Sequence, residues 1–302
     1  MFNTPILFLI FNRPDLTLQV FERIAAIQPT RLYIAADGPR PNYANDNILC
    51  SQCREIIDKI NWKCDVKTLF RPTNLGCKKA VSEAITWFFQ HEEDGIILED
   101  DCLPDESFFL FCQEMLNRYR MDERIMHISG DNFQNGEKRG EGDYYFSLYN
   151  HIWGWATWRR AWQLCINEAI DFNDINRFIK ENIQTNWGKN YWYDILYKVR
   201  NNRIDTWDYY WTFRIWANKG ISILPNKNLI KNIGFNAMGT HIKERPANIT
   251  QTLESMPPSY HDPIKIHVDR DADLVTERVF FQRRPLILRA TKKLLTFFGH
   301  KK

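Results

Sequence analysis

The sequence predicts an α/β fold in which a mainly parallel sheet is flanked by helices on both faces. Two observations lead to this prediction. Short apolar runs alternate with segments of helical periodicity through the first hundred residues. Their order, β-α-β-α-β-α-β, implies strands that run parallel and are connected by helices. The second half differs, since nine of the eleven tryptophans fall between Trp153 and Trp216.

The elements of the first half follow from their residues. Strands are expected at 6–11, 32–36, 66–70 and 95–99, each apolar and each ended by polar or turn residues. The helices between them present apolar residues at helical spacing. These are Val20, Phe21, Ile24 and Ile27 in the first helix, the segment 48–60 in the second, and Val81, Ala84, Ile85 and Phe88 in the third.

Three consecutive acids, Glu99, Asp100 and Asp101, end the fourth of these strands. Carboxylates crowded at the end of a buried strand repel each other, and a divalent cation would compensate them. Ligands of α/β sheets bind at the same edge. A solvated acidic turn is the alternative interpretation. Pro104 is then expected to open a helical segment with Phe108, Phe109 and Phe111 on it.

Charge and composition exclude some classes of protein. Residues 283–302 hold seven Lys and Arg and no acid, so residues 1–282 carry 33 basic and 37 acidic side chains. A body with a net charge of −4 is not that of a nucleic-acid binder. Seven cysteines without a disulfide-like spacing indicate free thiols in a reducing cytoplasm. Neither a signal peptide nor an apolar run of about 20 residues is visible.

Aromatic residues of the second half permit two interpretations. Trp153, Trp155 and their neighbours form one cluster, and Trp207 precedes Asp208 in another. Most such rings belong to the core of a protein. Aromatic faces also pack against the C–H bonds of sugar rings. A tryptophan next to a carboxylate favours a site.

Taken in order, these segments resemble a nucleotide-sugar-dependent glycosyltransferase of the GT-A fold. The sequence is similar to the bacterial hemolysin-like sugar transferases and, more distantly, to the β-1,2-N-acetylglucosaminyltransferase I family. The resemblance extends from about Pro5 to His241. It rests on Asn12-Arg13, Asp37, Asn74-Leu75-Gly76, Glu99-Asp100-Asp101, Ile128-Ser129-Gly130-Asp131-Asn132, Trp153-Gly154-Trp155 and Trp207-Asp208.

The resemblance implies a binding site for the donor, which we expect to be a UDP-sugar. Asp37 would accept the imide N–H of uracil, although Asp-Gly-Pro is also an ordinary turn sequence. Arg13 would contact the pyrophosphate with its forked guanidinium. Gly76, Lys78 and Lys79 would place backbone N–H groups and positive charge at a helix start, which is a favourable place for an anion.

The acidic triplet and a later histidine would form the metal site. By the same resemblance, Asp101 binds Mn2+ or Mg2+, Asp100 contacts the ribose or shares the metal, and Glu99 orients the strand end. His241 matches a position from which related enzymes bring a histidine to the metal. The metal would stabilise the departing nucleotide diphosphate as a Lewis acid.

Asp208 is the expected catalytic base. It opens a helical segment, and helix capping is its alternative role. Asp205 stands three residues earlier and is the better cap candidate. A single base opposite the leaving group implies inversion at the anomeric carbon. Trp153, Trp155 and Trp207 would contact a saccharide or lipid-linked saccharide acceptor, as in surface polysaccharide or lipid-linked glycan synthesis.

Two other functions remain open. A sugar nucleotidyltransferase would have a glycine-rich loop after the first strand, where this chain has Asn12-Arg13-Pro14-Asp15. A carbohydrate-binding protein with an inactive site would lack the acids that are present here.

The predicted organisation is a single GT-A domain followed by a C-terminal helix. Residues 1–102 form the nucleotide-binding half of the domain and residues 103–275 form the acceptor half. Residues 276–302 are expected to form a basic amphipathic helix, which either lies on an anionic membrane surface or packs on the fold. The protein is therefore expected in the cytoplasm, in solution or peripheral to the inner membrane.

Overall fold

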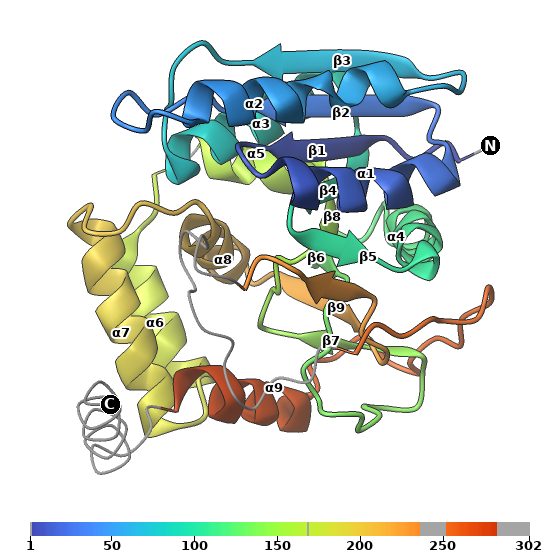
Figure 1. Cartoon of the computed structure of the whole chain (residues 1–302). Coiled ribbons are helices and arrows are strands. Elements are labelled where there is room, and N and C mark those ends of the chain that lie inside the picture. Colours follow the sequence, from blue (N-terminus) through green and yellow to red (C-terminus); the bar gives the residue numbers. More distant parts are fainter. Residues whose placement is uncertain (1, 168, 236–251, 283–302) are drawn as a thin grey trace, which may run out of the picture.

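The computed structural model describes residues 2–167, 169–235 and 252–282, and the statements below concern this part of the chain. A sheet of eight strands has the order β3-β2-β1-β4-β8-β6-β9-β7, and a second sheet pairs β10 with β5 (Figure 1). The strands are β1 (Ile6–Ile10), β2 (Arg31–Ala36), β3 (Asp65–Phe70), β4 (Asp94–Glu99), β5 (Cys102–Pro104), β6 (Ile125–Ser129), β7 (Tyr144–Ser147), β8 (Trp155–Trp158), β9 (Ile221–Pro225) and β10 (Ile230–Asn232).

The four strands of the first half are parallel. β1 pairs in parallel with β2 and with β4, and β2 pairs in parallel with β3. β8 then runs antiparallel to both β4 and β6, while β6 and β9 are parallel and β7 is antiparallel to β9. The predicted α/β class with a mainly parallel sheet is confirmed. Because β1, β2, β3 and β4 are parallel, their carboxyl ends meet along one edge.

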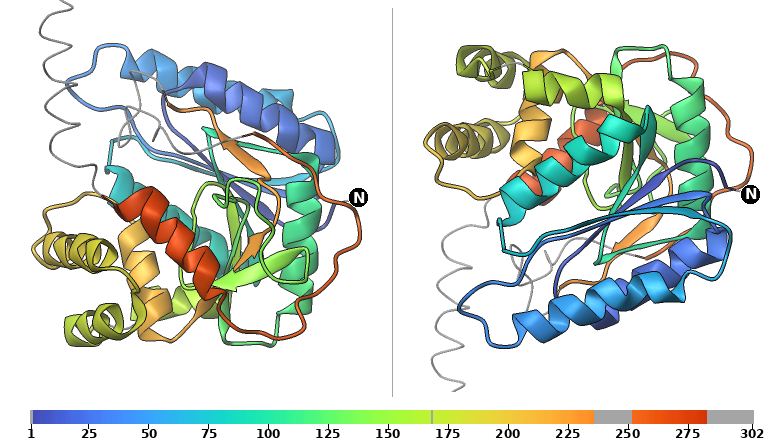
Figure 2. Two further views of the ribbon diagram at one scale, coloured as in Figure 1. Left: turned by 90° about the horizontal axis from the view of Figure 1, so that it is seen from below. Right: turned by 90° about the horizontal axis from the view of Figure 1, so that it is seen from above.

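Helices cover both faces of the sheet and enclose two separate apolar cores. α1, α2 and α4 pack on one face, and α3 and α5 to α8 pack on the other; Figure 2 shows α1 and α3 on opposite sides. The helices are α1 (Pro14–Ile27), α2 (Asp46–Arg54), α3 (Cys77–His91), α4 (Glu106–Arg118), α5 (Arg159–Asn167), α6 (Phe172–Asn182), α7 (Asn186–Arg200), α8 (Asp208–Ala217) and α9 (Arg270–Thr276).

Most apolar positions predicted from the sequence are in the core. Val20, Phe21 and Ile24 of α1 are buried, as are Ala84, Ile85 and Phe88 of α3. Most tryptophans of the second half are also core residues, as expected, and Trp155, Trp158, Trp211 and Trp216 are among the largest fully buried side chains. All seven cysteines are free thiols.

Two local predictions are corrected. Pro104 does not open a helix, because it is the last residue of β5; α4 begins at Glu106, and Asp105 caps it by accepting from the Ser107 N–H at 2.9 Å. Asp105 thereby satisfies an N–H group of the first turn of α4, which has no partner within the helix. The helix expected at 48–60 is divided into α2 and a 3-10 turn, Glu55–Lys59.

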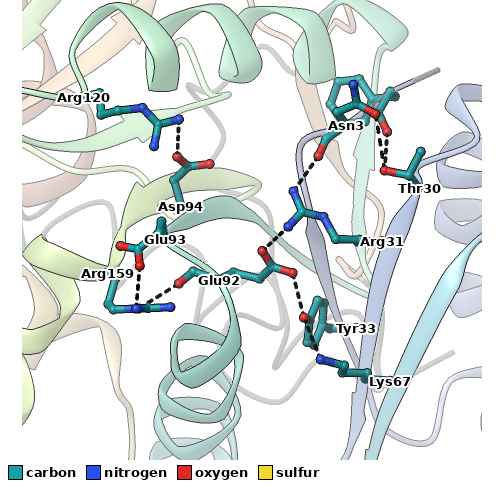
Figure 3. A network of polar contacts seen from close by, with 11 residues as sticks. Asn3, Thr30, Arg31, Tyr33, Lys67, Glu92, Glu93, Asp94, Arg120 and Arg159 are labelled. Atoms are coloured by element: carbon teal, nitrogen blue, oxygen red, sulfur yellow. Dashed lines mark hydrogen bonds and ion pairs between the residues drawn. The ribbon is translucent and has the colours of Figure 1, made fainter.

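A second acidic run, Glu92-Glu93-Asp94, leads into β4 at the amino end of the strand. Each of its acids has its own arginine, so the charges are balanced one to one (Figure 3). The ion pairs are Arg31 with Glu92, Arg159 with Glu93 and Arg120 with Asp94. Tyr33 donates a further hydrogen bond to Glu92 at 2.7 Å. At this end of β4 each acid is therefore neutralised by an arginine.

The sheet continues through both predicted halves of the domain, since β1 to β4 come from residues 1–102 and β6 to β9 from 103–275. Of the C-terminal segment 276–302, Glu277–Phe281 form a π-helical turn whose Glu277 is buried and accepts hydrogen bonds from Tyr149 and Thr185. Residues 283–302, most of the predicted amphipathic helix, lie outside the described part of the chain. No described helix is long and apolar enough to cross a membrane.

Candidate active site

A cleft of about 430 Å³ lies at the carboxyl ends of β1, β2 and β4. Its volume is within the range of pockets that bind small molecules. One wall consists of residues that directly follow these parallel strands, and the facing wall includes the segment 205–208 and Trp153. Eight residues predicted for the site line this cleft, namely Arg13, Asp37, Gly76, Asp100, Asp101, Trp153, Trp207 and Asp208.

Three further predicted site residues do not line it. Lys78 donates from Nζ to the hydroxyl of Tyr210 at 2.8 Å. The side chain of Lys79 is 64% exposed and pairs with Glu83 one helical turn later, so Lys79 is not placed to hold a ligand in the cleft. Trp155 is fully buried, and its ring stacks on that of Trp207 with centroids 5.4 Å apart. It therefore supports Trp207 from behind and cannot touch an acceptor. The remaining predicted residue, His241, lies outside the described residues.

A single arginine neutralises part of the acidic triplet. Arg13 donates from Nε to Asp100 at 3.3 Å, from its second terminal nitrogen to the same carboxylate, and from Nη1 to Asp101 at 2.8 Å. Although burial lowers the pKa of Arg13, the charges of Asp100 and Asp101 raise it above its usual value. Glu99 has no ion pair with any described residue. One arginine thus serves a run of three acids here, whereas the three acids at the other end of β4 each have their own.

Crowding of the carboxylates also affects Glu99, the last residue of β4. Burial, and then the charges of Asp101 and Asp100, raise the pKa of the Glu99 carboxyl. Asp208 adds to this shift, which shows that its charge is felt across the cleft. Like charges that crowd a low-dielectric site favour the binding of a cation.

The donor atoms in the cleft fit a hard divalent cation that also binds a substrate. Carboxylate oxygens are the ligands that Mg2+ and Mn2+ prefer. Within the described residues, no group of three or more His, Cys, Asp or Glu side chains is placed to hold a metal ion by itself. Mg2+ is commonly bound by one or two carboxylates together with phosphate oxygens. The triplet therefore fits a cation that is shared with a phosphorylated ligand.

Asp37 organises the loop that leads into α3. Its carboxylate accepts hydrogen bonds from the Leu75 N–H at 3.0 Å, the Gly76 N–H at 3.2 Å and the Asn74 side-chain amide at 2.9 Å. Burial raises the pKa of Asp37, although these hydrogen bonds oppose the shift. Gly76 has a φ of +81°, which disfavours other residues, and a Cβ there would lie 2.9 Å from Asp205 Oδ2. Asp37 thus fixes one wall of the cleft.

Asp208 is the first residue of α8. Its carboxylate accepts a hydrogen bond from the hydroxyl of Thr206, another cleft residue. The expectation that Asp205 caps this helix is wrong, because Trp207 occupies the cap position and no side chain caps the helix there. Asp205 lines the cleft instead and approaches Gly76. Two carboxylates near the start of α8, those of Asp205 and Asp208, therefore line the cleft.

Trp153 forms part of the facing wall. Its ring meets the edges of Phe133 and Phe235, with centroids 5.3 and 5.5 Å away. Its N–H donates to the fully buried Asp131 at 3.0 Å, so the loop after β6 holds the backbone of Trp153 in place. Trp153 and Trp207 are the predicted acceptor residues that the fold brings to the cleft.

Two arginines that line the cleft were not predicted from the sequence. Arg40 and Arg71 line the cleft, and Arg40 is fixed by Asp46 at 2.7 Å and lies over the ring of Tyr43 at 3.6 Å. Arg71 directly follows β3 and pairs with Glu83 at 2.8 Å. The same signal that pointed to Arg13, a basic residue directly after a parallel strand, would have found Arg71. Gly234 was missed as well; a Cβ there would lie 2.3 Å from Asp101 Oδ2.

No known protein-family model matches the sequence, and no curated protein matches it either. Among solved structures, the fold is similar to that of S. aureus TarS, with a TM-score of 0.42 and 10% identity over 76% of this chain and 59% of that one. The chain thus spans about three fifths of the TarS chain that it matches.

Two further solved structures are similar. A UDP-glucose pyrophosphorylase complexed with UDP-glucose has a TM-score of 0.38 and 12% identity over 74% of this chain and 90% of that one. HddC from Yersinia pseudotuberculosis has a TM-score of 0.30 and 11% identity over 52% and 77%. These similarities concern the fold and identify no activity for this chain.

Proposed function

We propose that this protein is a metal-dependent, inverting glycosyltransferase that moves a sugar from a UDP-sugar to a saccharide acceptor. One observation carries the proposal. Two sets of carboxylates face the same cleft, one at the end of β4 with too little positive charge around it and one at the start of α8. The first set fits a cation and a diphosphate, and the second fits a base.

On the donor side, Asp101 holds a divalent ion and Asp100 contacts the ribose or shares that ion. When bound, Mn2+ or Mg2+ supplies Lewis-acid charge to the departing nucleotide diphosphate. Arg13 adds a forked cation that suits phosphate oxygens. Asp37 borders the cleft at the end of β2, where it would meet the nucleobase and also holds the 74–76 loop in place.

On the acceptor side, Asp208 takes the proton of the attacking hydroxyl group. A carboxylate in this role must reach the hydroxyl directly or through one water molecule. Trp153 and Trp207 line the same cavity. Trp153 is half-buried and its ring would pack against sugar C–H bonds, whereas Trp207 is buried and would help to exclude water. The acceptor in this proposal is a saccharide or a lipid-linked saccharide of surface polysaccharide synthesis.

The decisive experiment begins with donor binding. A panel of nucleotide sugars is tested with and without Mn2+ for a rise in melting temperature, since a ligand that binds the native state stabilises it. The best ligand then serves as donor in a transfer assay with saccharide acceptors. We expect a UDP-sugar to bind in a Mn2+-dependent way, and we expect transfer to stop in excess chelator.

Asp101→Ala should abolish transfer and leave the fold intact. Asp174→Ala is the matched control, because it removes a half-exposed carboxylate of α6 whose only ion pair in the described chain is with Arg177 on the surface. Full activity of Asp101→Ala, or of the wild type in chelator, would exclude the metal-dependent mechanism. Release of inorganic pyrophosphate from a sugar phosphate and a nucleoside triphosphate would show a nucleotidyltransferase instead.

A further inference from the structure

One guanidinium group bridges the two adjacent carboxylates on which the donor site depends. Arg13 uses Nε and one terminal nitrogen on Asp100 and its other terminal nitrogen on Asp101. Its backbone is fixed, since Arg13 follows β1 closely and directly precedes Pro14, the first residue of α1. The side chain is 16% exposed and lines the cleft. The guanidinium charge can therefore move only if the side chain of Arg13 changes its conformation.

The two halves of this bridge are unequal. Asp100 receives two of the three hydrogen bonds and its side chain is 3% exposed. Asp101 receives one, and its side chain is 15% exposed. The contact with Asp101 uses Oδ2, and Asp101 is the carboxylate that the proposed function assigns to the metal. Arg13 thus contacts the more exposed carboxylate, Asp101, and is held more firmly by the buried carboxylate of Asp100.

We propose that Arg13 is an internal counter-ion that competes with the divalent cation for Asp101, so that metal binding depends on the nucleotide. This inference rests on the proposed function. Without a diphosphate, the guanidinium satisfies Asp101 and weakens the binding of metal alone. A diphosphate in the cleft offers new acceptors, and Arg13 transfers one contact from Asp101 to a phosphate oxygen while it keeps Asp100.

The chemistry of the groups favours this exchange. Carboxylates and phosphates both match the planar fork of a guanidinium, so the same donors serve either partner. A carboxylate oxygen that accepts from a guanidinium cannot bind a cation at the same position, because the two positive charges repel. Metal and nucleotide should therefore each raise the affinity of the other by the same factor, as thermodynamic linkage requires.

Calorimetric titration of Mn2+ tests the competition directly, without any assay of activity. Mn2+ alone is titrated into the wild type, Arg13→Gln and Arg124→Gln, and each titration is repeated with saturating UDP. We expect Arg13→Gln to bind Mn2+ alone roughly tenfold more tightly than the wild type does. The factor by which UDP increases Mn2+ affinity should be smaller in the same variant than in the wild type, and what remains reflects phosphate oxygens that bind the cation directly.

Arg124→Gln is the matched control. It removes the same charge at a side chain that is 61% exposed and pairs with Asp122 outside the cleft. It should behave like the wild type. Arg13→Lys serves as a second variant, since it keeps a positive charge for buried Asp100 but lacks the fork. Its affinity for Mn2+ alone should lie between those of the wild type and Arg13→Gln.

Equal or weaker binding of Mn2+ alone by both Arg13 variants would overturn the inference. A coupling factor that the variants leave unchanged would overturn it as well. Failure of the proposed function has a different signature, because the wild type would then bind neither UDP nor any nucleotide sugar. The comparison of Mn2+ affinities without nucleotide decides the role of Arg13 in either case.

Discussion

Gly234 packs against Asp101, so Gly234→Ala tests the proposed role of Asp101 without removing any functional group. Gly234 follows β10, and the preceding residue, Ile233, donates its N–H to the carbonyl of Asp101 at 2.8 Å. A Cβ at position 234 would lie 2.3 Å from Asp101 Oδ2 and 2.9 Å from its Cβ. Ordinary contacts begin at 3.4 Å, so the carboxylate must move by about 1 Å. The backbone of Gly234 itself accepts alanine without strain.

A displacement of about 1 Å at a positioning residue can lower a rate by roughly 10²-fold. We therefore expect Gly234→Ala to reduce transfer by roughly this factor and to weaken Mn2+ binding in the presence of UDP. Calorimetry and initial rates measure the two effects, and thermal unfolding checks that the fold is kept.

Gly136→Ala is the control for this experiment. Gly136 has a φ of +85°, and no atom lies within 4 Å of the place that a Cβ would take there. Alanine at this position therefore costs about 1 kcal/mol of unfolding free energy through backbone strain. It should not affect transfer. If Gly234→Ala retained transfer rate and metal affinity within about twofold of the wild type, Asp101 would not be the metal ligand.

Three other predictions concern separate parts of the molecule. Asp208→Asn keeps the shape of the side chain but removes the proton acceptor, so turnover should fall by roughly 10²–10⁴-fold. The affinity for the donor should stay nearly unchanged. NMR of the wild-type product should show an inverted anomeric configuration, and retention would refute the single-base mechanism. Burial raises the pKa of Asp273 to about 7, so the folded state keeps a proton that the unfolded state releases near pH 4. The contribution of Asp273 to stability should then fall by about 2 kcal/mol between pH 5 and pH 7 and level off above, and Asp273→Asn should remove this contribution in denaturant titrations. Deletion of 283–302 should abolish co-sedimentation with anionic vesicles at low salt if this segment binds membranes; a full-length protein that ignores such vesicles would contradict that role.

The sequence correctly placed the residues that follow the parallel strands beside one another at the cleft. Parallel strands place the residues that follow them at one edge, so Arg13, Asp37 and Asp101 had to converge once the strands were recognised. The strands were recognised because their apolar runs are short, β-branched and separated by helical periodicity. The hydrophobic pattern and the order of strands and helices were therefore sufficient to predict which residues meet at this edge.

Direction of individual side chains was not predictable in the same way. Trp155 and Trp207 stand in similar aromatic clusters and both are buried, yet only Trp207 lines the cleft, because Trp155 lies within β8 and Trp207 lies at the start of α8. Lys79 is in the first turn of α3 but points to solvent. Small rotations of a strand or helix decide such outcomes, and they depend on packing with distant segments.

By itself, the sequence determined the fold class, the edge of the sheet that carries the site and the excess of acid at that edge. Only the tertiary structure decided how this charge is balanced. Glu92, Glu93 and Asp94 each have an arginine from elsewhere in the fold, while Asp100 and Asp101 share Arg13 and Glu99 has no ion pair with a described residue. The two acidic runs look alike as sequence, because ion pairs between distant residues leave no local pattern; their different surroundings exist only once the chain has folded.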